Sequence, residues 1–186
     1  SCIILFTRKA CYWIRALWYS GLVHVRPVVD IPCHDAPDLG GALDRLASCE
    51  PPLGQVEVIV VINGSEKDSP AVARQNQHTF SQATDWLSER SNAWLPIHLL
   101  QLPDLPPRHA GVGQARQIGM DEALRRFADI GPAEDGLLVR YDADCRCSAH
   151  YFTGTDPHFA VPPAAPGCSI HFEQTGRAHV CTPVPH

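Results

Sequence analysis

The sequence predicts an α/β domain, in which a mostly parallel central sheet is flanked by helices in a layered arrangement. Four short apolar runs have the composition of buried strands, and three segments between them have helical spacing or composition. Strand and helix therefore alternate along the chain, which favours parallel strands joined by helical crossovers. A chain of 186 residues is long enough to build one such domain around a hydrophobic core.

The first strand is expected at residues 26–32 (RPVVDIP), an apolar run that ends in proline. A helix is expected at residues 37–48, where leucines recur at helical spacing. Asp35 is the predicted N-cap of this helix, because a carboxylate accepts hydrogen bonds from first-turn amides.

The second strand is the clearest in the sequence. Residues 56–62 (VEVIVVI) are nearly all apolar and rich in β-branched side chains, as expected of a central parallel strand buried on both faces. Residues 63–65 (NGS) are predicted to end it. A helix is expected at 71–90, which contains no Pro or Gly, and a third strand at 97–102.

A loop at 103–111 is predicted to lead into a helix at 113–127, and a fourth strand at 137–141. In open α/β sheets, ligands bind outside the carboxyl ends of the strands. We therefore expect chain segments that follow the strands to converge on one site. These segments are residues 33–35, 63–65, 103–113 and 142–144.

Composition excludes several classes of function. The net charge is −5 and there is no basic block, so no nucleic-acid partner is expected. The eight cysteines are irregularly spaced, which favours reduced thiols and a cytoplasmic location over a disulfide framework. Residues 1–25 are apolar but interrupted by charges, so no membrane span is predicted. Association of the parent protein with a membrane stays open but is not indicated by this sequence.

An acidic pair, Asp142 and Asp144, follows the fourth predicted strand. Mg²⁺ and Mn²⁺ prefer oxygen ligands and bind through one or two carboxylates together with substrate phosphates. Such a cation neutralises the charge that grows on a diphosphate leaving group. Solvated acidic pairs are common at strand ends, so this pair indicates a metal site only in combination with other motifs in the sequence.

Four segments in order carry a resemblance to a known family. They are PCHD (32–35), VEVIVVINGS (56–65), HAGVGQARQIGMDEAL (109–124) and DAD (142–144). Their order and spacing resemble the nucleotide-binding half of family 2 glycosyltransferases with the GT-A fold. The family pattern is IPxYNE, EVIVVDDGS, GxxxARNxG and DADD. The resemblance covers residues 26–152 and implies sugar transfer from a nucleotide-diphosphate sugar to the hydroxyl of an unknown acceptor, with Mg²⁺ or Mn²⁺ as cofactor.

The resemblance also implies roles for individual residues. Asp35 would contact the nucleotide, and Asn63 with Ser65 would approach the base. Arg116 would lie near the phosphates, and Asp144 would be the metal ligand, with Asp142 supporting it or contacting the ribose. The implied donor-binding set is Pro32, His34, Asp35, Asn63, Ser65, Arg116 and Asp142, and the implied metal ligands are Asp144 and Asp142.

The sequence departs from the family pattern at two positions. Asn63 and the residue before it replace the usual acidic pair, which leaves the identity of the base open with only a weak preference for uracil. Cys145 replaces the last aspartate of the DADD pattern, at its fourth position. The metal site therefore carries less negative charge, and weak metal binding is expected.

Three parts are predicted along the chain: an extra or misassigned segment (1–25), an incomplete GT-A-like domain (26–173) and a non-native tail (174–186). Residues 176–186 (GRAHVCTPVPH) resemble a translated sequencing adapter. The general base of the family lies further along than the matched motifs, and Glu173 is only a weak candidate. The expectation is therefore a fragment that binds the donor and transfers sugar poorly or not at all.

Other functions fit the sequence less well. A sugar nucleotidyltransferase shares the layered fold but carries a Gly-rich loop after its first strand, unlike PCHD here. A dinucleotide loop at 111–113 lacks its third glycine, since Arg116 stands there. Cys145, Cys147 and His150 have no second ligand pair for zinc. A non-catalytic nucleotide-binding fragment remains an alternative.

Overall fold

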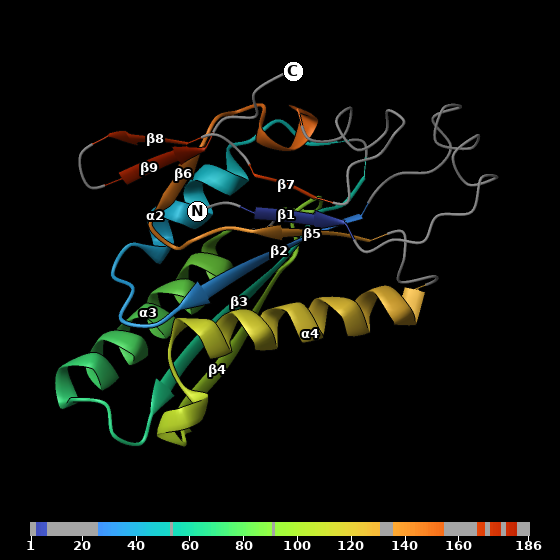
Figure 1. Cartoon of the computed structure of the whole chain (residues 1–186). Helices are drawn as coiled ribbons and strands as arrows, with labels where there is room; N and C mark the ends of the chain where they lie inside the picture. The colour runs from blue at the N-terminus through green and yellow to red at the C-terminus, as the bar shows by residue number, and fades with distance from the viewer. Residues whose placement is uncertain are drawn as a thin grey trace.

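A computed structural model describes residues 3–6, 26–52, 54–90, 92–130, 136–154, 167–169, 172–175 and 178–181. It confirms the α/β class, with a parallel four-stranded core sheet between helices (Figure 1). The predicted alternation is present throughout that core. Its elements are β2 (Arg26–Cys33), α2 (Leu39–Ala47), β3 (Glu57–Ser65), α3 (Pro70–Glu89), β4 (Ile97–Leu105), α4 (Val112–Ile130) and β5 (Gly136–Arg140).

The main sheet has the strand order β4-β3-β2-β5-β1-β7. β2, β3, β4 and β5 are mutually parallel, whereas β1 (Ile3–Phe6) runs antiparallel to both β5 and β7 (Gly167–Ser169). From β2 the chain first moves outward to β3 and β4, and α4 then returns it to β5 on the other side of β2. The strand order thus reverses between β2 and β5, where doubly wound sheets bind their ligands.

A second, smaller sheet follows the core. It contains β6 (Cys145–Cys147), β9 (Ala178–Cys181) and β8 (Phe172–Thr175), in that order. β6 pairs with β9 in parallel, and β8 pairs with β9 in antiparallel orientation. Because β6 begins directly after the acidic turn, this sheet lies next to the carboxyl end of β5.

The alternating side chains of β3 explain why the sheet is covered on both faces. Val58, Val60 and Ile62 pack with residues of α2 and α3, and Ile59 and Val61 pack with residues of α4. Successive side chains of a strand point to opposite faces, so an uninterrupted apolar run serves two cores at once. Figure 1 shows the same arrangement, with α4 on one face and α2 and α3 on the other.

Two strands are longer than predicted. The predicted break at 63–65 is wrong, because β3 continues to Ser65 and keeps pairing with β4, whose last residue is Leu105. The register shifts between Asn63 and Ser65, so the glycine between them makes an irregularity within the strand and does not end it. β4 likewise runs three residues past the predicted end at 102.

The predicted N-cap of α2 is also wrong. Asp38 occupies the N-cap position and makes no side-chain cap hydrogen bond, whereas Asp35 adopts a left-handed backbone with φ of 53°. A turn between these residues delays the helix. By contrast, α3 begins with an ordinary cap, in which the Ser69 hydroxyl accepts a hydrogen bond from the N–H of Val72 at 3.3 Å and Pro70 occupies the first turn.

The two ends of the chain also contribute strands. Residues 3–6 of the segment expected to be extra or misassigned form β1, and β8 crosses the predicted boundary between the domain and the tail at residue 173. β9 falls within the tail expected to be non-native. Residues 7–25 and 182–186 lie outside the described residues. None of the helices described is both long and apolar enough to cross a bilayer.

Candidate functional site

Asn63 connects two of the segments that the sequence places at the site. It lies at the carboxyl end of β3 with no exposed surface, and its Nδ2 donates a hydrogen bond to the carbonyl of Gly111 at 2.9 Å. Gly111 has φ of 92°, a conformation that favours glycine, and immediately precedes α4. The side chain of Asn63 therefore holds the start of α4 against the end of β3.

Asn76 of α3 joins the ends of β2 and β3. Its Nδ2 donates to the Asn63 carbonyl at 3.0 Å, and its Oδ1 accepts from the Asp35 N–H at 2.8 Å. The Nδ1 of His34 lies 3.0 Å from the same Asn63 carbonyl. Asn76 is 7% exposed, and its hydrogen bond to the Asn63 carbonyl is buried, whereas the one from Asp35 is partly buried. One amide thus fixes two strand ends, which the sequence alone did not reveal.

The backbone of Asp35 is strained. A positive φ is uncommon for a residue with a side chain, although aspartate tolerates it better than most. Such conformations persist where surrounding contacts enforce them, and they cluster at functional sites. Here the contact is the hydrogen bond that the Asp35 N–H donates to Oδ1 of Asn76, and the carboxylate of Asp35 remains exposed to solvent.

Ser65 lies in a tight turn at the end of β3. Its N–H donates to Oδ2 of Asp68 at 2.8 Å, and its hydroxyl accepts from the N–H of Lys67 at 3.1 Å. Oδ2 of Asp68 also lies 3.9 Å from Nδ1 of His34. A Cβ on Gly64 would lie 2.8 Å from the Pro103 carbonyl, so the close approach of β4 requires glycine at this position.

Arg116 and Asp142 form the charged part of the site. Nη2 of Arg116, in the first turns of α4, donates to Oδ1 of Asp142 at 3.2 Å. The two side chains are 34% and 21% exposed, so the pair is partly shielded from water. Asp142 follows β5, and the ion pair therefore spans the point where the strand order reverses.

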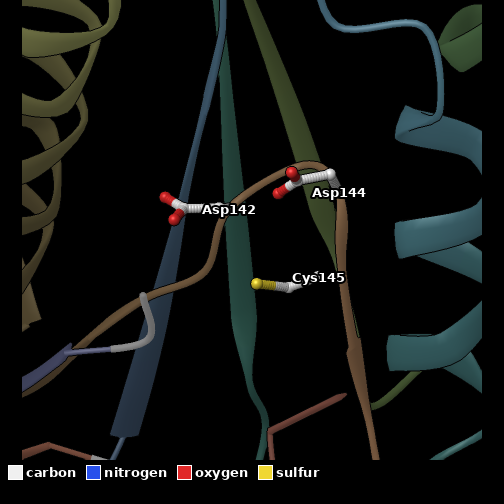
Figure 2. Close-up of side chains that lie close together, drawn as sticks. All are labelled: Asp142, Asp144 and Cys145. Carbon is white, nitrogen blue, oxygen red and sulfur yellow. The ribbon is translucent and has the colours of Figure 1, made fainter. Parts of the chain in front are cut away.

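Asp142, Asp144 and Cys145 form the one group suited to a metal ion among the described residues. One ligand atom from each lies within 4.8 Å of the others, and Figure 2 shows the three side chains close together at the turn. The N–H of Cys145 donates to the Asp142 carbonyl at 2.9 Å, and the Tyr141 hydroxyl donates to the Cys145 carbonyl at 2.8 Å. The backbone that presents both carboxylates is thus held from within the turn.

The donor set of this group fits a hard divalent cation. Asp144 is exposed and free to adjust, while Asp142 is partly buried, and carboxylate oxygens are the ligands that Mg²⁺ and Mn²⁺ prefer. Cys145 is 1% exposed and offers a soft sulfur atom, which Mg²⁺ does not select. The two aspartates are therefore the residues that would hold Mg²⁺ or Mn²⁺.

A buried carboxylate lies next to the charged part of the site. Asp30 of β2 has no exposed surface, and neither of its oxygens has a hydrogen-bond partner. Burial raises the pKa of Asp30 to about 7, although the positive charges of Arg140 and Arg116 oppose this rise. The negative charge of Asp142 acts in the same direction as burial. Asp30 therefore belongs to the same electrostatic group as the Arg116–Asp142 pair.

The residues proposed from the sequence fall into two linked groups. His34, Asp35, Asn63 and Ser65 lie around the ends of β2 and β3, and the second group is Arg116, Asp142 and Asp144. The Asn63–Gly111 hydrogen bond links them. Pro32 belongs to neither group, because it is buried within β2 opposite Val61 of β3.

Sequence reasoning missed three residues: Asn76, Asp68 and Asp30. A signal existed for two of them. Asp30 is the lone acidic residue in an apolar strand, and Asn76 lies on the same helical stripe as the buried Ala83 and Trp86. A polar residue on a buried face needs a partner, which marks it as a candidate for holding nearby backbone.

The grouping of Cys145 and Cys147 with His150 finds no support as a metal site. His150 is exposed, and its Nδ1 lies 2.9 Å from Oε2 of Glu50. Comparison of the chain with protein-family models, with curated proteins and with solved structures gave no match.

Proposed function

We propose that this chain binds a nucleotide-diphosphate sugar and belongs to a metal-assisted glycosyltransferase of the family 2 type. The donor is held at the carboxyl ends of β2, β3 and β5, with its diphosphate near Asp142 and Asp144. A reduced, cytoplasmic setting is part of the proposal. The acceptor is a hydroxyl compound, and no residue is assigned as the general base.

The observation that carries the proposal is the position of the Arg116–Asp142 pair and Asp144. These residues come from α4 and from the turn after β5, at the reversal of strand order. That location is where doubly wound sheets bind nucleotides, because strand ends and helix starts face a shared crevice. The combination of one arginine and two carboxylates suits a diphosphate bound together with a divalent cation.

Different residues of this chain have different roles in binding the donor. Asp142 and Asp144 would hold the cation, and a bound Mg²⁺ or Mn²⁺ supplies charge neutralisation for the departing diphosphate. Arg116 offers donors to phosphate oxygens while its pairing with Asp142 fixes the guanidinium in place. Asn63 and Asn76 keep the ends of β2 and β3 together, so the exposed Asp35 carboxylate is held toward the nucleoside.

Calorimetric titration of the chain with uridine and guanosine diphosphates, with and without Mn²⁺, tests the proposal. We expect binding that requires Mn²⁺ and weakens at least tenfold in Asp144→Asn, a change of about 1.4 kcal/mol. Asp121→Asn is the matched control, since Asp121 is an exposed aspartate of α4 and should bind as the parent does. Metal-independent binding of equal strength in Asp144→Asn would overturn the proposed role of the acidic pair.

Two further outcomes separate the proposal from its alternatives. Release of nucleoside diphosphate from sugar donors, in step with Mn²⁺ binding, supports a transferase. Formation of pyrophosphate from a nucleoside triphosphate and a sugar phosphate would instead indicate a nucleotidyltransferase and contradict the proposal. Failure of every diphosphate to bind contradicts it as well.

A further inference from the structure

Two cysteines from distant parts of the sequence lie together beside the acidic turn. The Sγ atoms of Cys49, just after α2, and Cys147, the last residue of β6, are 3.5 Å apart. Their side chains are 5% and 9% exposed. The sequence predicts reduced thiols, and nothing in the spacing of the cysteines predicts this pairing, which is a product of the fold.

Backbone contacts hold the two segments at this separation. The N–H of Glu50 donates to the carbonyl of Ala149 at 2.8 Å, one residue after Cys49 and two residues after Cys147. Oε2 of Glu50 lies 2.9 Å from Nδ1 of His150, and Sγ of Cys49 lies 3.5 Å from the Ser148 carbonyl. These contacts hold the two segments side by side, so the two thiols face each other.

We propose that Cys49 and Cys147 form a reversible disulfide when the chain meets a hydroperoxide. A disulfide has sulfur atoms about 2.05 Å apart, so closure needs a movement of about 1.5 Å. Rotation about χ1 of one or both cysteines supplies such a movement while the backbone contacts stay in place. The inference does not depend on the proposed function.

The two thiols are suited to different steps of disulfide formation: attack on the peroxide, and attack on the sulfenic acid that results. The pKa of Cys147 is lowered, chiefly by its hydrogen bond with the Cys49 thiol and also by the positive charge of Arg45, although burial opposes this change. The pKa of Cys49 is raised by the same hydrogen bond and by burial, which keeps it protonated. Cys147 is thus the nucleophile, since the thiolate is the reactive form.

The chemistry balances with one molecule of hydrogen peroxide. The Cys147 thiolate attacks one peroxide oxygen, the O–O bond breaks, and a sulfenic acid forms with release of hydroxide. The Cys49 sulfur then attacks the sulfenic sulfur, and the S–S bond forms as the oxygen leaves. The displaced protons convert both oxygens to water, so two thiols lose two electrons. A small oxidant suits the limited exposure of both sulfurs.

The disulfide would join the segment after α2 to the segment after the acidic turn. Cys147 lies three residues after Asp144, and α2 begins four residues after Asp35. A bond that closes so long a loop constrains the unfolded chain strongly. We therefore expect the oxidised chain to melt at a temperature on the order of 5 °C or more above that of the reduced chain.

Peptide mapping of the whole chain before and after treatment with hydrogen peroxide provides the test. We expect a Cys49–Cys147 cross-linked peptide as the main product, a mass loss of about 2 Da from the two hydrogens removed, and full reversal by a phosphine reductant. Cys49→Ala and Cys147→Ala should each abolish that peptide and the rise in melting temperature. Cys33→Ala is the matched control, because Cys33 is also buried and its Sγ contacts the Ile31 carbonyl at 3.8 Å.

The wild-type map keeps the test decisive if a variant fails to fold. A main product that joins other cysteines would overturn the proposal. So would equal alkylation of Cys49 and Cys147 in treated and untreated protein, because it shows that both thiols remain free.

Discussion

Gly119 of α4 lies directly against the carboxylate of Asp30 in β2. A Cβ placed on Gly119 would be 1.8 Å from Oδ1 of Asp30, far closer than any van der Waals contact. The absence of a side chain at Gly119 therefore sets how closely α4 approaches the sheet. This contact lies one helical turn beyond Arg116, so it also determines where the arginine stands relative to Asp142.

Gly119→Ala is expected to destabilise the fold by about 2–3 kcal/mol, because the buried carboxylate has no solvent into which it can move. Gly113→Ala in the same helix is the control. No heavy atom lies within 4 Å of a Cβ at Gly113, so this change should be neutral or stabilise by up to about 1 kcal/mol. Urea unfolding of both variants measures the difference.

A double-mutant cycle extends this experiment. In Asp30→Ala the overlapping oxygen is gone, so adding Gly119→Ala to that background should cost much less than it does in the parent chain. Equal costs in the two backgrounds would mean that the overlap with Asp30 is not the source of the destabilisation.

The raised pKa of Asp30 predicts that the stability of the fold depends on pH. Its pKa is about 7 in the folded chain, against an ordinary value of 3.8, chiefly because of burial. The unfolded chain therefore loses this proton at lower pH than the folded chain does. The contribution of this proton to the free energy of unfolding is fully present below about pH 4. It declines as the pH rises and is gone above about pH 7.

Asp30→Asn removes this titration without changing the size of the side chain. The difference in unfolding free energy between Asp30→Asn and the parent should shift in favour of the variant by about 3 kcal/mol from pH 4.5 to pH 8. Comparing the two pH values cancels any constant cost of placing an amide near Arg116 and Arg140. Parallel pH profiles for parent and variant would show that Asp30 has the same pKa in both folding states.

The parts that the sequence predicted are those set by local pattern. The apolar run of β3 specifies a strand buried on both faces, and it was predicted almost to its first residue. Its end was missed, because pairing with β4 overrides the turn preference of Gly64. Asp35 was misassigned as an N-cap for a similar reason, since its backbone is held by a hydrogen bond that its N–H donates to a side chain of α3, and no local rule contains that bond.

The residues of the candidate site also fall into those that local sequence reveals and those that depend on tertiary contacts. The positions of Asp142 and Asp144 follow from the end of one strand, and the sequence is sufficient to find them. The role of Asn76 depends on its contacts with the ends of β2 and β3, and the role of Asp30 depends on what α4 places against it. Contacts between residues far apart in sequence leave only a weak signal, here a polar residue on an otherwise apolar face.

Asn76 offers the sharpest test of how the strand ends are held. A carboxylate at this position still accepts the Asp35 N–H but cannot donate to the Asn63 carbonyl, so Asn76→Asp should lose one of the two hydrogen bonds. The lost hydrogen bond to the Asn63 carbonyl and the added buried charge should together destabilise the fold by about 2–3 kcal/mol. Gln82→Glu makes the same amide-to-carboxylate change at an exposed position of α3 and should alter stability by less than about 0.5 kcal/mol.

Hydrogen exchange separates the two bonds of Asn76. The Asp35 amide should exchange much faster in Asn76→Ala, which lacks the acceptor, than in Asn76→Asp, which keeps it. Both variants are destabilised, so stability alone would not distinguish a local effect from a general one. If the Asp35 amide exchanges equally fast in the two variants, the strained backbone at Asp35 is held by something other than Asn76, and the link between β2 and β3 at the site must be sought elsewhere.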